Sequence, residues 1–410
     1  MRGFGKDKKS KKIKISNIPS QPSQEQLINQ AFTYHSQGNI QEAAKYYQHF
    51  INQGFKDHRV FSNYGTILKN LGQLKEAEKL YQQAIQLKPD FADAHSNLGN
   101  LLRDLSKDQD AQVSLRKAIE LNPNHINAHV NLGLILQTLG QLKEAEILTR
   151  KAIELKPDFV DAHYNLGIIL RDQGKLEEAE LVDRKGIDID LMKNIDSKFK
   201  EKYLKNIPLS KSQFRQDLFA LTELNFKSNG FFVEFGSCDG FIGSNSYILE
   251  KFFNWNGILA EPAKCWHKKL KKNRLANIET KCVWKSSDEE ISFHEPYYYK
   301  QMSSIDNFSD TNKDCFEEGK RYTVKTISLL DLLDKNEAPR DIDYLSIDTE
   351  GSEYEILKNF NFHKYKFRVI TCEHNFNPIR EKIYHLLISK GYKRKFETIS
   401  RVDDWYVFSE

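Results

Sequence analysis

The sequence has no long hydrophobic run, few cysteines and little excess charge of either sign. No apolar segment approaches the roughly 18–20 residues needed to span a bilayer, which excludes an integral membrane protein. The five cysteines are odd in number and contain no Cys-x-x-Cys pair, so neither a disulfide framework nor a zinc site is visible, and a cytoplasmic compartment is expected. A formal net charge of +4 is too small to indicate a nucleic-acid partner.

The small basic excess is concentrated at the start of the chain. Residues 1–20 hold seven basic side chains against one acidic one, which leaves the rest of the chain slightly acidic. No apolar stretch follows them, so they do not form a secretory signal. We expect a basic, disordered tail over residues 1–23, and the length of 410 residues indicates two or three domains.

A period of about 34 residues runs through the first half of the chain. Windows that share one register cover residues 24–57, 58–91, 92–125, 126–159 and 160–193. Small residues recur where two helices would meet, at Ala31, Gly65, Gly99, Gly133 and Gly167, and again at Ala43, Ala77, Ala111, Ala145 and Ala179. Glycines typical of helix C-termini stand at Gly38, Gly72, Gly140 and Gly174. The pattern predicts five helical hairpins stacked as an α-solenoid over residues 24–193.

These windows resemble the tetratricopeptide repeat family, most clearly at Asn97–Leu102 and Leu142–Glu146. The resemblance implies a right-handed stack of helical hairpins whose concave groove binds a peptide or a partner protein. Histidines also recur at the repeat spacing, at His95, His129 and His163. They occupy the position held by Leu27 and Phe61 in the first two windows, so we expect helix packing rather than a metal ladder.

The repeat ends after residue 193, and the composition then changes. Residues 194–211 are rich in lysine, contain Pro208 and are expected to form a linker. Short apolar runs then alternate with helical segments, at residues 230–235, 257–260, 281–284, 343–347, 367–372 and 405–408. Such runs predict a doubly wound α/β domain over residues 212–410, in which ligands bind beyond the carboxyl ends of the strands.

The first two of these runs end in residues that suit a cationic ligand without phosphate. Gly236 and Gly240 permit a tight turn and a close approach of the ligand to the backbone. Their spacing lacks the Gly-x-Gly-x-x-Gly pattern of a pyrophosphate site, and the preceding Glu234 disfavours an anion. Glu261, at the end of the second run, can accept both hydroxyls of a ribose. Together these residues favour S-adenosylmethionine as the cofactor.

Several segments of the second half match one family in the expected order: Ser212–Asp217, Gly230–Gly240, Trp255–Pro262, Ile327–Asp331 and Ile342–Glu353. Through them the chain resembles the FkbM family of S-adenosylmethionine-dependent methyltransferases. The resemblance implies a Rossmann-like methyltransferase domain that methylates hydroxyls of sugars or other metabolites. It also implies that the cofactor is held by Glu234, Gly236, Ser237, Asp239, Gly240 and Glu261, with glutamate rather than aspartate at position 234 as a departure.

Polar residues follow the fourth and fifth strands expected in the sheet, on its ligand side. A poorly acidic hydroxyl needs a base or a metal ion to withdraw its proton. We favour a direct role for Asp348, Glu350 or His374 as that base, without a metal ion. Two alternatives stay open. Asp348, Glu350 and Glu373 could bind magnesium or manganese, or Glu350 and Glu353 could only cap a helix N-terminus.

The favoured function is therefore methyl transfer to a hydroxyl-bearing acceptor, which could be a sugar, a metabolite or a glycan, with a repeat module for protein interaction. One alternative is a repeat scaffold whose α/β half has lost catalysis, against which the glycine loop and Glu261 argue. Another is a methyltransferase that acts on protein. A basic cluster over residues 264–274 is expected to be a solvated helix face, and Tyr297–Tyr299 are expected in an insertion on the acceptor side.

Overall fold

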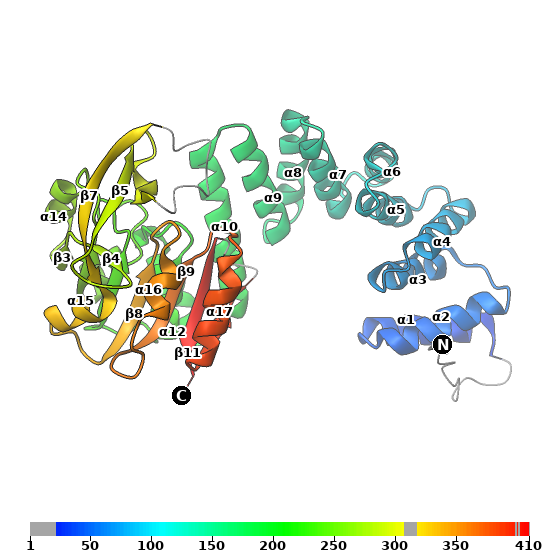
Figure 1. The fold of residues 1–410 in the computed structure, drawn as a ribbon. Coiled ribbons are helices and arrows are strands. Elements are labelled where there is room, and N and C mark those ends of the chain that lie inside the picture. The colour runs from blue at the N-terminus through cyan, green and yellow to red at the C-terminus, as the bar shows by residue number, and fades with distance from the viewer. Residues whose placement is uncertain (1–21, 307–317, 398–399, 401, 410) are drawn as a thin grey trace, which may run out of the picture. The chain divides into compact units, whose positions relative to one another are not determined.

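The computed structural model describes residues 22–306, 318–397, 400 and 402–409 (Figure 1). The predicted basic tail, apart from its last two residues, lies outside the described residues. The chain divides into two compact units, Met1–Ala179 and Glu180–Glu410. Among the described residues, no helix is long and apolar enough to cross a membrane.

The first unit is a succession of helical hairpins (Figure 1). The paired helices are α1 (Gln24–Ser36) with α2 (Ile40–Asn52), α3 (His58–Asn70) with α4 (Leu74–Leu87), α5 (Ala92–Asp104) with α6 (Asp108–Leu121), and α7 (Ile126–Thr138) with α8 (Leu142–Leu155). The fifth window contains α9 (Val160–Asp172) and most of α10 (Leu176–Asn194). The predicted α-solenoid is thereby confirmed.

Small residues let the two helices of a hairpin approach closely. A Cβ atom on Gly99 would lie 2.5 Å from Leu115 Cγ, and one on Gly133 would lie 2.5 Å from Thr149 Oγ1. The first helix of a hairpin is followed by a residue with positive φ, which is a glycine except in the third window, where Ser106 has φ 57°. Glycine adopts this conformation without a steric penalty, which explains its recurrence at the predicted position.

The repeat histidines serve the turns between windows. Each uses Nε2 to bond the carbonyl oxygen of the proline six residues earlier, at 2.9 Å for His95 and 2.8 Å for both His129 and His163. The ring therefore ties the first helix of a window to the turn that precedes it. The only group of metal-ligating side chains found among the described residues contains none of these histidines.

The second unit is built on a seven-stranded sheet in the order β10-β11-β9-β8-β1-β2-β3. Its strands are β1 (Phe231–Phe235), β2 (Asn256–Ala260), β3 (Asn277–Glu279), β8 (Asp341–Ile347), β9 (Lys366–Glu373), β10 (Tyr392–Lys395) and β11 (Asp403–Phe408). The strands from β9 to β3 run parallel, whereas β11 pairs antiparallel with both of its neighbours.

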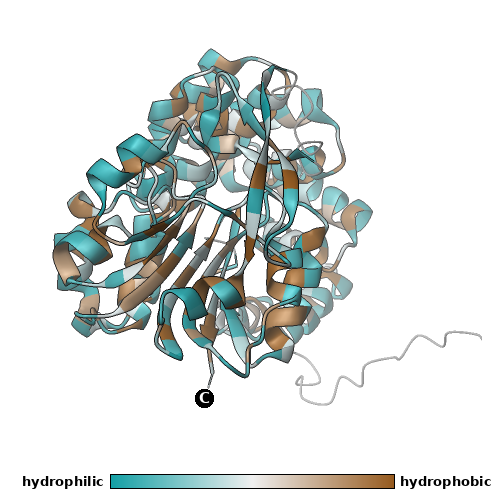
Figure 2. Cartoon of the chain, turned by 60° about the vertical axis from the view of Figure 1, so that its left-hand side comes forward, coloured by the Kyte–Doolittle hydropathy of each residue, from teal (hydrophilic) through white to brown (hydrophobic). Residues whose placement is uncertain are grey.

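In Figure 2 the strands of this sheet are mainly brown, the colour of hydrophobic residues. Buried side chains such as Val233, Ile258 and Leu345 form its core, as expected for a sheet covered on both faces. The predicted α/β architecture is confirmed.

The helices that follow the repeats connect or cover these strands. They are α11 (Ser197–Asn206), the 3₁₀ turn η1 (Ile207–Leu209), α12 (Gln216–Glu223), α13 (Tyr247–Phe253), α14 (His267–Asn273), the 3₁₀ turn η2 (Lys300–Met302), α15 (Leu329–Lys335), α16 (Glu353–Lys358) and α17 (Ile379–Ser389). Residues 194–211, expected to form a linker, are thus largely helical. Tyr203 on α11 is fully buried and donates to Asp188 Oδ1 at 2.8 Å, and Arg215 Nε donates to the same oxygen at 2.9 Å. The lysines that suggested a linker include Lys198 and Lys202, which lie on the exposed face of this helix.

A second, four-stranded sheet has the order β4-β7-β5-β6. Its strands are β4 (Cys282–Trp284), β5 (Glu290–Pro296), β6 (Ser304–Ile305) and β7 (Gly319–Ser328). The run at residues 281–284 was expected in the main sheet but belongs to this one. No apolar run marked β5 or β7, because polar residues interrupt both strands and much of β7 is exposed. Tyr297–Tyr299 follow β5, and their side chains are exposed.

Candidate active site

The carboxyl ends of four parallel strands meet at one edge of the main sheet. From β1 the chain proceeds to β2 and β3 on one side, whereas β8 and β9 lie on the other side. The point where the strand order reverses is the usual ligand site of an open α/β sheet. Glu234, Glu261, Asp348 and Glu373 stand at or just beyond the ends of β1, β2, β8 and β9. The fold therefore gathers the acidic residues that were selected from the sequence.

The loop after β1 depends on its glycines. Gly236 has φ 71°, and a Cβ atom there would lie 1.9 Å from the backbone oxygen of Asp348. Gly240 has φ 73°, and its Cβ would lie 2.6 Å from both Leu270 Cδ1 and Arg274 Cγ. Neither position can take a side chain without moving the backbone or its neighbours, so the loop lies directly against the end of β8 and against α14.

Glu261 connects the glycine loop to the end of β2. Its Oε2 accepts the backbone N–H of Cys238 at 2.8 Å, and its Oε1 accepts that of Ala263 at 2.8 Å. Burial raises the pKa of Glu261 to about 8, although the two N–H groups favour the ionised form. Each oxygen keeps one more lone pair, so the carboxyl group can also accept hydrogen bonds from a ligand.

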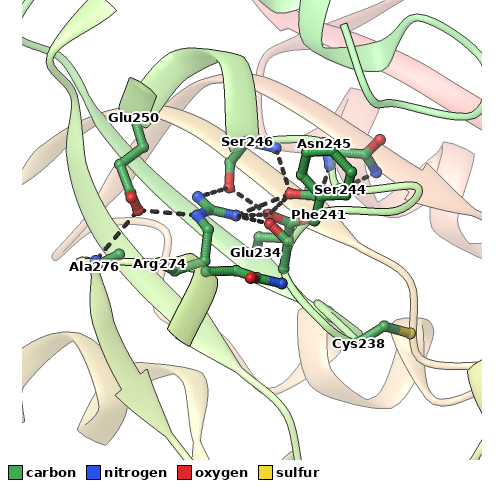
Figure 3. Close-up of polar contacts among 12 residues, drawn as sticks. Glu234, Cys238, Phe241, Ser244, Asn245, Ser246, Glu250, Arg274 and Ala276 are labelled. Carbon is green, nitrogen blue, oxygen red and sulfur yellow. Dashed lines mark hydrogen bonds and ion pairs between the residues drawn. The ribbon is translucent and has the colours of Figure 1, made fainter. Parts of the chain in front are cut away.

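Glu234 is engaged by protein groups on every side (Figure 3). Its Oε1 accepts the backbone N–H of Asn245 at 2.8 Å, and its Oε2 accepts the hydroxyls of Ser244, at 3.1 Å, and of Ser246. Arg274 Nη1 lies 3.8 Å from Oε2, and the Glu234 residue is only 2% exposed. The carboxylate therefore holds the segment between the glycine loop and α13, and it faces these groups rather than a pocket.

The other residues predicted from the glycine loop lie around its turn. Asp239 Oδ1 accepts the backbone N–H groups of Phe241 and Ile242, both at 2.9 Å, so this carboxylate stabilises the turn. Ser237 Oγ is buried and has no hydrogen-bond partner among the described residues. The structure thus brings Gly236 and Glu261 to the pocket described below, whereas Glu234 and Asp239 support the loop.

A cluster of three carboxyl groups lies beyond β8 and β9. One oxygen from each of Asp348, Glu350 and Glu373 lies within 4.8 Å of the others. Burial raises the pKa of both glutamates, and the charge of Asp348 raises them further. By contrast, Glu353, the first residue of α16, accepts from the backbone N–H groups of Thr349 and Gly351, both at 3.0 Å, so its carboxylate holds the loop before the helix rather than capping the helix N-terminus. We call Asp348, Glu350 and Glu373 the acid cluster.

His374 follows the acid cluster in the chain, but its ring nitrogens point to other groups. Its Nδ1 accepts the backbone N–H of Phe376 at 2.9 Å, and its Nε2 lies 3.8 Å from Asp404 Oδ1. Burial lowers the pKa of His374, the effect expected for an imidazole away from water. Asp404 in turn accepts from Arg380 Nη2 at 2.7 Å.

Two neighbouring pockets meet at Glu350. The first is lined by residues that include Gly236, Glu261, Trp266, Phe293, Asp348 and Glu350. The second is lined by residues that include Glu350, Glu373, His374, Asn375 and Asn377. Trp266 and Phe293 were not selected from the sequence. The sequence around an aromatic residue does not show whether its side chain lines a pocket or packs in a core. Phe293 lies on β5, just before Tyr297–Tyr299, and none of these three tyrosines lines either pocket.

Comparisons with known proteins agree with both halves of the chain. The methyltransferase FkbM domain matches residues 234–400, and tetratricopeptide repeats match residues 65–106, 99–140, 126–159 and 148–180. A comparison with curated proteins gives no match.

Several solved structures are similar to part of the chain. A MamA protein is 21% identical, with a TM-score of 0.36, over 44% of this chain and 94% of the other. MamA from Desulfovibrio magneticus RS-1 is 20% identical, with a TM-score of 0.37, over 42% of this chain and 97% of the other. YrrB, described as a TPR protein with an unusual peptide-binding site, is 24% identical, with a TM-score of 0.35, over 45% of this chain and 92% of the other. The sheet order, the site at the strand ends and the matched segments agree: the chain joins a tetratricopeptide repeat array to a methyltransferase domain of the FkbM family.

Proposed function

We propose that the protein is an S-adenosylmethionine-dependent O-methyltransferase that acts on a hydroxyl of a sugar or another metabolite. One observation carries the proposal: Gly236, Glu261, Asp348 and Glu350 line a single pocket at the switch point of the sheet. A pocket rich in carboxyl groups suits a cofactor with a positive sulfonium and disfavours a nucleotide with phosphates. When bound, S-adenosylmethionine supplies a methyl group that its sulfonium already activates.

The residues present fit this cofactor. Glu261 is fixed by two backbone N–H groups and retains lone pairs that can accept the hydroxyls of a ribose. Ser237 Oγ is a buried hydroxyl without a partner among the described residues, next to the close-packed Gly236. In this proposal Glu234, with its carboxylate taken up by Ser244 and Asn245, acts on the cofactor only by holding the loop in place.

The acid cluster would activate the acceptor. Asp348 and Glu350 line the same pocket as Glu261, so a hydroxyl placed there could pass its proton to either carboxylate. Trp266 and Phe293 would exclude water from the same pocket. His374 is the weaker candidate for the base: it lines the neighbouring pocket with Glu350, but its Nδ1 lone pair already accepts the backbone N–H of Phe376.

The repeat array supports a further part of the proposal, which is that the first unit binds a peptide or a partner protein. The similar protein YrrB is described as peptide-binding, and arrays of this kind present extended surfaces. We also propose a cytoplasmic location, which suits the low number of cysteines and the four that are free among the described residues.

Cofactor binding tests the proposal directly. Calorimetry on the full chain should detect S-adenosylmethionine, and Glu261→Gln should weaken binding by about tenfold or more, because the amide NH2 that replaces one carboxyl oxygen cannot accept a ribose hydroxyl and an unmade buried hydrogen bond costs about 1–3 kcal/mol. Glu337→Gln, an exposed glutamate after α15, is the matched control and should bind as the wild type does. Absence of binding at millimolar cofactor would favour a repeat scaffold without catalysis.

The acceptor class needs a second experiment. The purified protein and methyl-labelled cofactor would be incubated with a cell extract, and the label would be separated by size and chemical class. Label in base-stable ethers of small molecules or glycans supports the proposal. Label confined to protein would instead support the alternative of a protein methyltransferase.

A further inference from the structure

The acid cluster is assembled by the pairing of two parallel strands. Ile347 of β8 lies opposite Cys372 of β9, so the next residues, Asp348 and Glu373, follow side by side at the carboxyl ends of the two strands. Glu350 joins them from the loop after β8, where its φ of 57° turns the chain back. Carboxyl oxygens of the three residues come within 4.8 Å of one another.

Few groups of the described protein neutralise the negative charge of the acid cluster. No ion pair between described residues includes any of the three side chains, whereas nearby Asp404 is paired with both Arg380 and Arg394. Glu350 Oε2 accepts a single long hydrogen bond, from Asn375 Nδ2 at 3.4 Å. Three carboxylates so close together repel one another unless protons or a cation neutralise them.

Glu373 gives a second, independent indication of a ligand. The Glu373 residue is 9% exposed, and although its carboxyl group also bonds Asp348, its Oε2 has no hydrogen-bond partner among the described residues. A buried carboxylate oxygen without a partner carries a desolvation cost that a bound ligand would remove. Glu353 shows the contrast, because its carboxylate is used by the backbone of its own loop. Bonds to its own loop therefore account for Glu353 and do not account for the acid cluster.

We propose that Asp348, Glu350 and Glu373 bind one divalent cation of the magnesium or manganese class. All three ligands offer oxygen, which these hard cations prefer, and few carboxylates with the remaining positions left to water or substrate are typical of magnesium sites. The cation site lies where the two pockets meet at Glu350. An acceptor oxygen in either pocket could therefore take one of its remaining positions.

The existence of this site does not depend on the proposed methyl transfer, but its role in catalysis does. A cation that binds the acceptor hydroxyl lowers the pKa of that hydroxyl. The O–H bond would break with its electron pair left on the oxygen, and the proton would pass to a carboxylate oxygen of Glu350 that does not bind the cation. The same residue can thus hold the cation and act as the base.

Direct binding of Mn²⁺ tests the inference. The full chain would be treated with a chelator, dialysed and titrated with Mn²⁺ while free Mn²⁺ is followed by electron paramagnetic resonance. We expect one site in the wild type and at least tenfold weaker binding in Glu373→Gln, which keeps the shape of the side chain. Glu381→Gln, an exposed glutamate in the first turn of α17, is the matched control and should bind Mn²⁺ as the wild type does.

Calorimetry on the same samples with S-adenosylhomocysteine, the demethylated product of S-adenosylmethionine, separates the two proposals. It also checks that the variant is folded. Mn²⁺ binding that is equal in the wild type and Glu373→Gln, or absent at millimolar Mn²⁺, overturns the cation site even if the cofactor product binds. Mn²⁺ binding that depends on Glu373, in a protein that binds neither S-adenosylmethionine nor its product, supports the site and contradicts the proposed function.

Discussion

Arg274 is the group whose removal should damage the cofactor side of the methyltransferase domain most. Its side chain is fully buried and lies between two carboxylates (Figure 3). Nε donates to Glu250 Oε2 at 3.0 Å, and Nη1 lies 3.8 Å from Glu234 Oε2. Nη1 also donates to Ser244 Oγ at 2.9 Å, and Nη2 donates to Ser246 Oγ at 2.8 Å. One guanidinium thus joins α14 to β1, to the segment after the glycine loop and to α13.

Arg274→Met removes the charge and keeps most of the volume. Glu234 would then be buried without a cation and Glu250 would keep only Lys251, and loss of one partner of a buried ion pair typically costs about 3–5 kcal/mol. A unit of this size loses about 2–4 °C of melting temperature per kcal/mol, so a fall of roughly 6–20 °C is expected. Arg274→Lys should recover only part of this loss, because an ammonium group cannot reach all these acceptors in the fixed geometry of a guanidinium.

Urea unfolding of the full chain, followed by tryptophan fluorescence, measures the effect, since all four tryptophans follow the repeats. Lys271→Met, on the exposed face of the same helix, is the matched control and should lie within about 0.5 kcal/mol of the wild type. Adding Glu250→Gln to Arg274→Met should restore part of the stability, because it removes a carboxylate that has lost one of its two cations and keeps only Lys251. A loss below 1 kcal/mol in Arg274→Met, or strict additivity in the double variant, would refute this account.

Three further predictions concern the glycine loop, a buried acid and a repeat turn. Gly236→Ala should weaken binding of S-adenosylmethionine more than tenfold by calorimetry, since the new Cβ would lie 1.9 Å from a backbone oxygen. Gly243→Ala is the control and should bind nearly normally, because Gly243 has a similar φ of 73° but nothing lies within 4 Å of its Cβ position. An equal loss of binding in both variants would contradict close packing at Gly236 as the cause. Burial raises the pKa of Asp217 to about 6 from an ordinary value of 3.8, so its contribution to stability is complete below pH 4 and is lost as the pH rises through 6. The unfolding free energy of Asp217→Asn should therefore gain about 3 kcal/mol on the wild type between pH 4 and pH 7 in urea titrations, and a constant difference would refute the assignment. Ser106→Gly should stabilise the repeat array by about 0.5–1 kcal/mol in thermal or urea unfolding, because Ser106 has φ 57°, and Ser106→Ala should give no gain; a gain of equal size in the alanine variant would rule out backbone strain as its source.

Local patterns were sufficient where one segment decides its own structure. The repeat register located α1 to α10, because each helix buries small residues at positions such as Gly99 and Ala111 that recur with the period. Continuous apolar runs located β1, β2, β8, β9 and β11, because these strands are covered on both faces. They did not locate β5, β7 or β10, whose residues alternate with polar ones because one face or an edge of the strand meets water.

The site was selected from the sequence only in part. The rule that ligands bind at strand ends singled out Glu261 and Asp348, and both line one pocket. The same rule predicted that Glu234 contacts the cofactor, whereas in the structure its carboxylate faces protein groups. Its actual partners, Ser246 and Arg274, could not be inferred, because no local pattern shows which distant side chains will surround a carboxylate.

The sequence by itself determined the order of the parts, the hairpins of the repeat array and the presence of acidic residues after buried strands, because these depend on periodicity and composition within short segments. Only the tertiary structure decided what the acids do. Parallel pairing of β8 with β9 set Asp348 beside Glu373, whereas the packing of α14 against the glycine loop gave Glu234 its cation. Chemically identical carboxyl groups therefore differ in role because burial and neighbouring charge, which the fold alone supplies, differ between them.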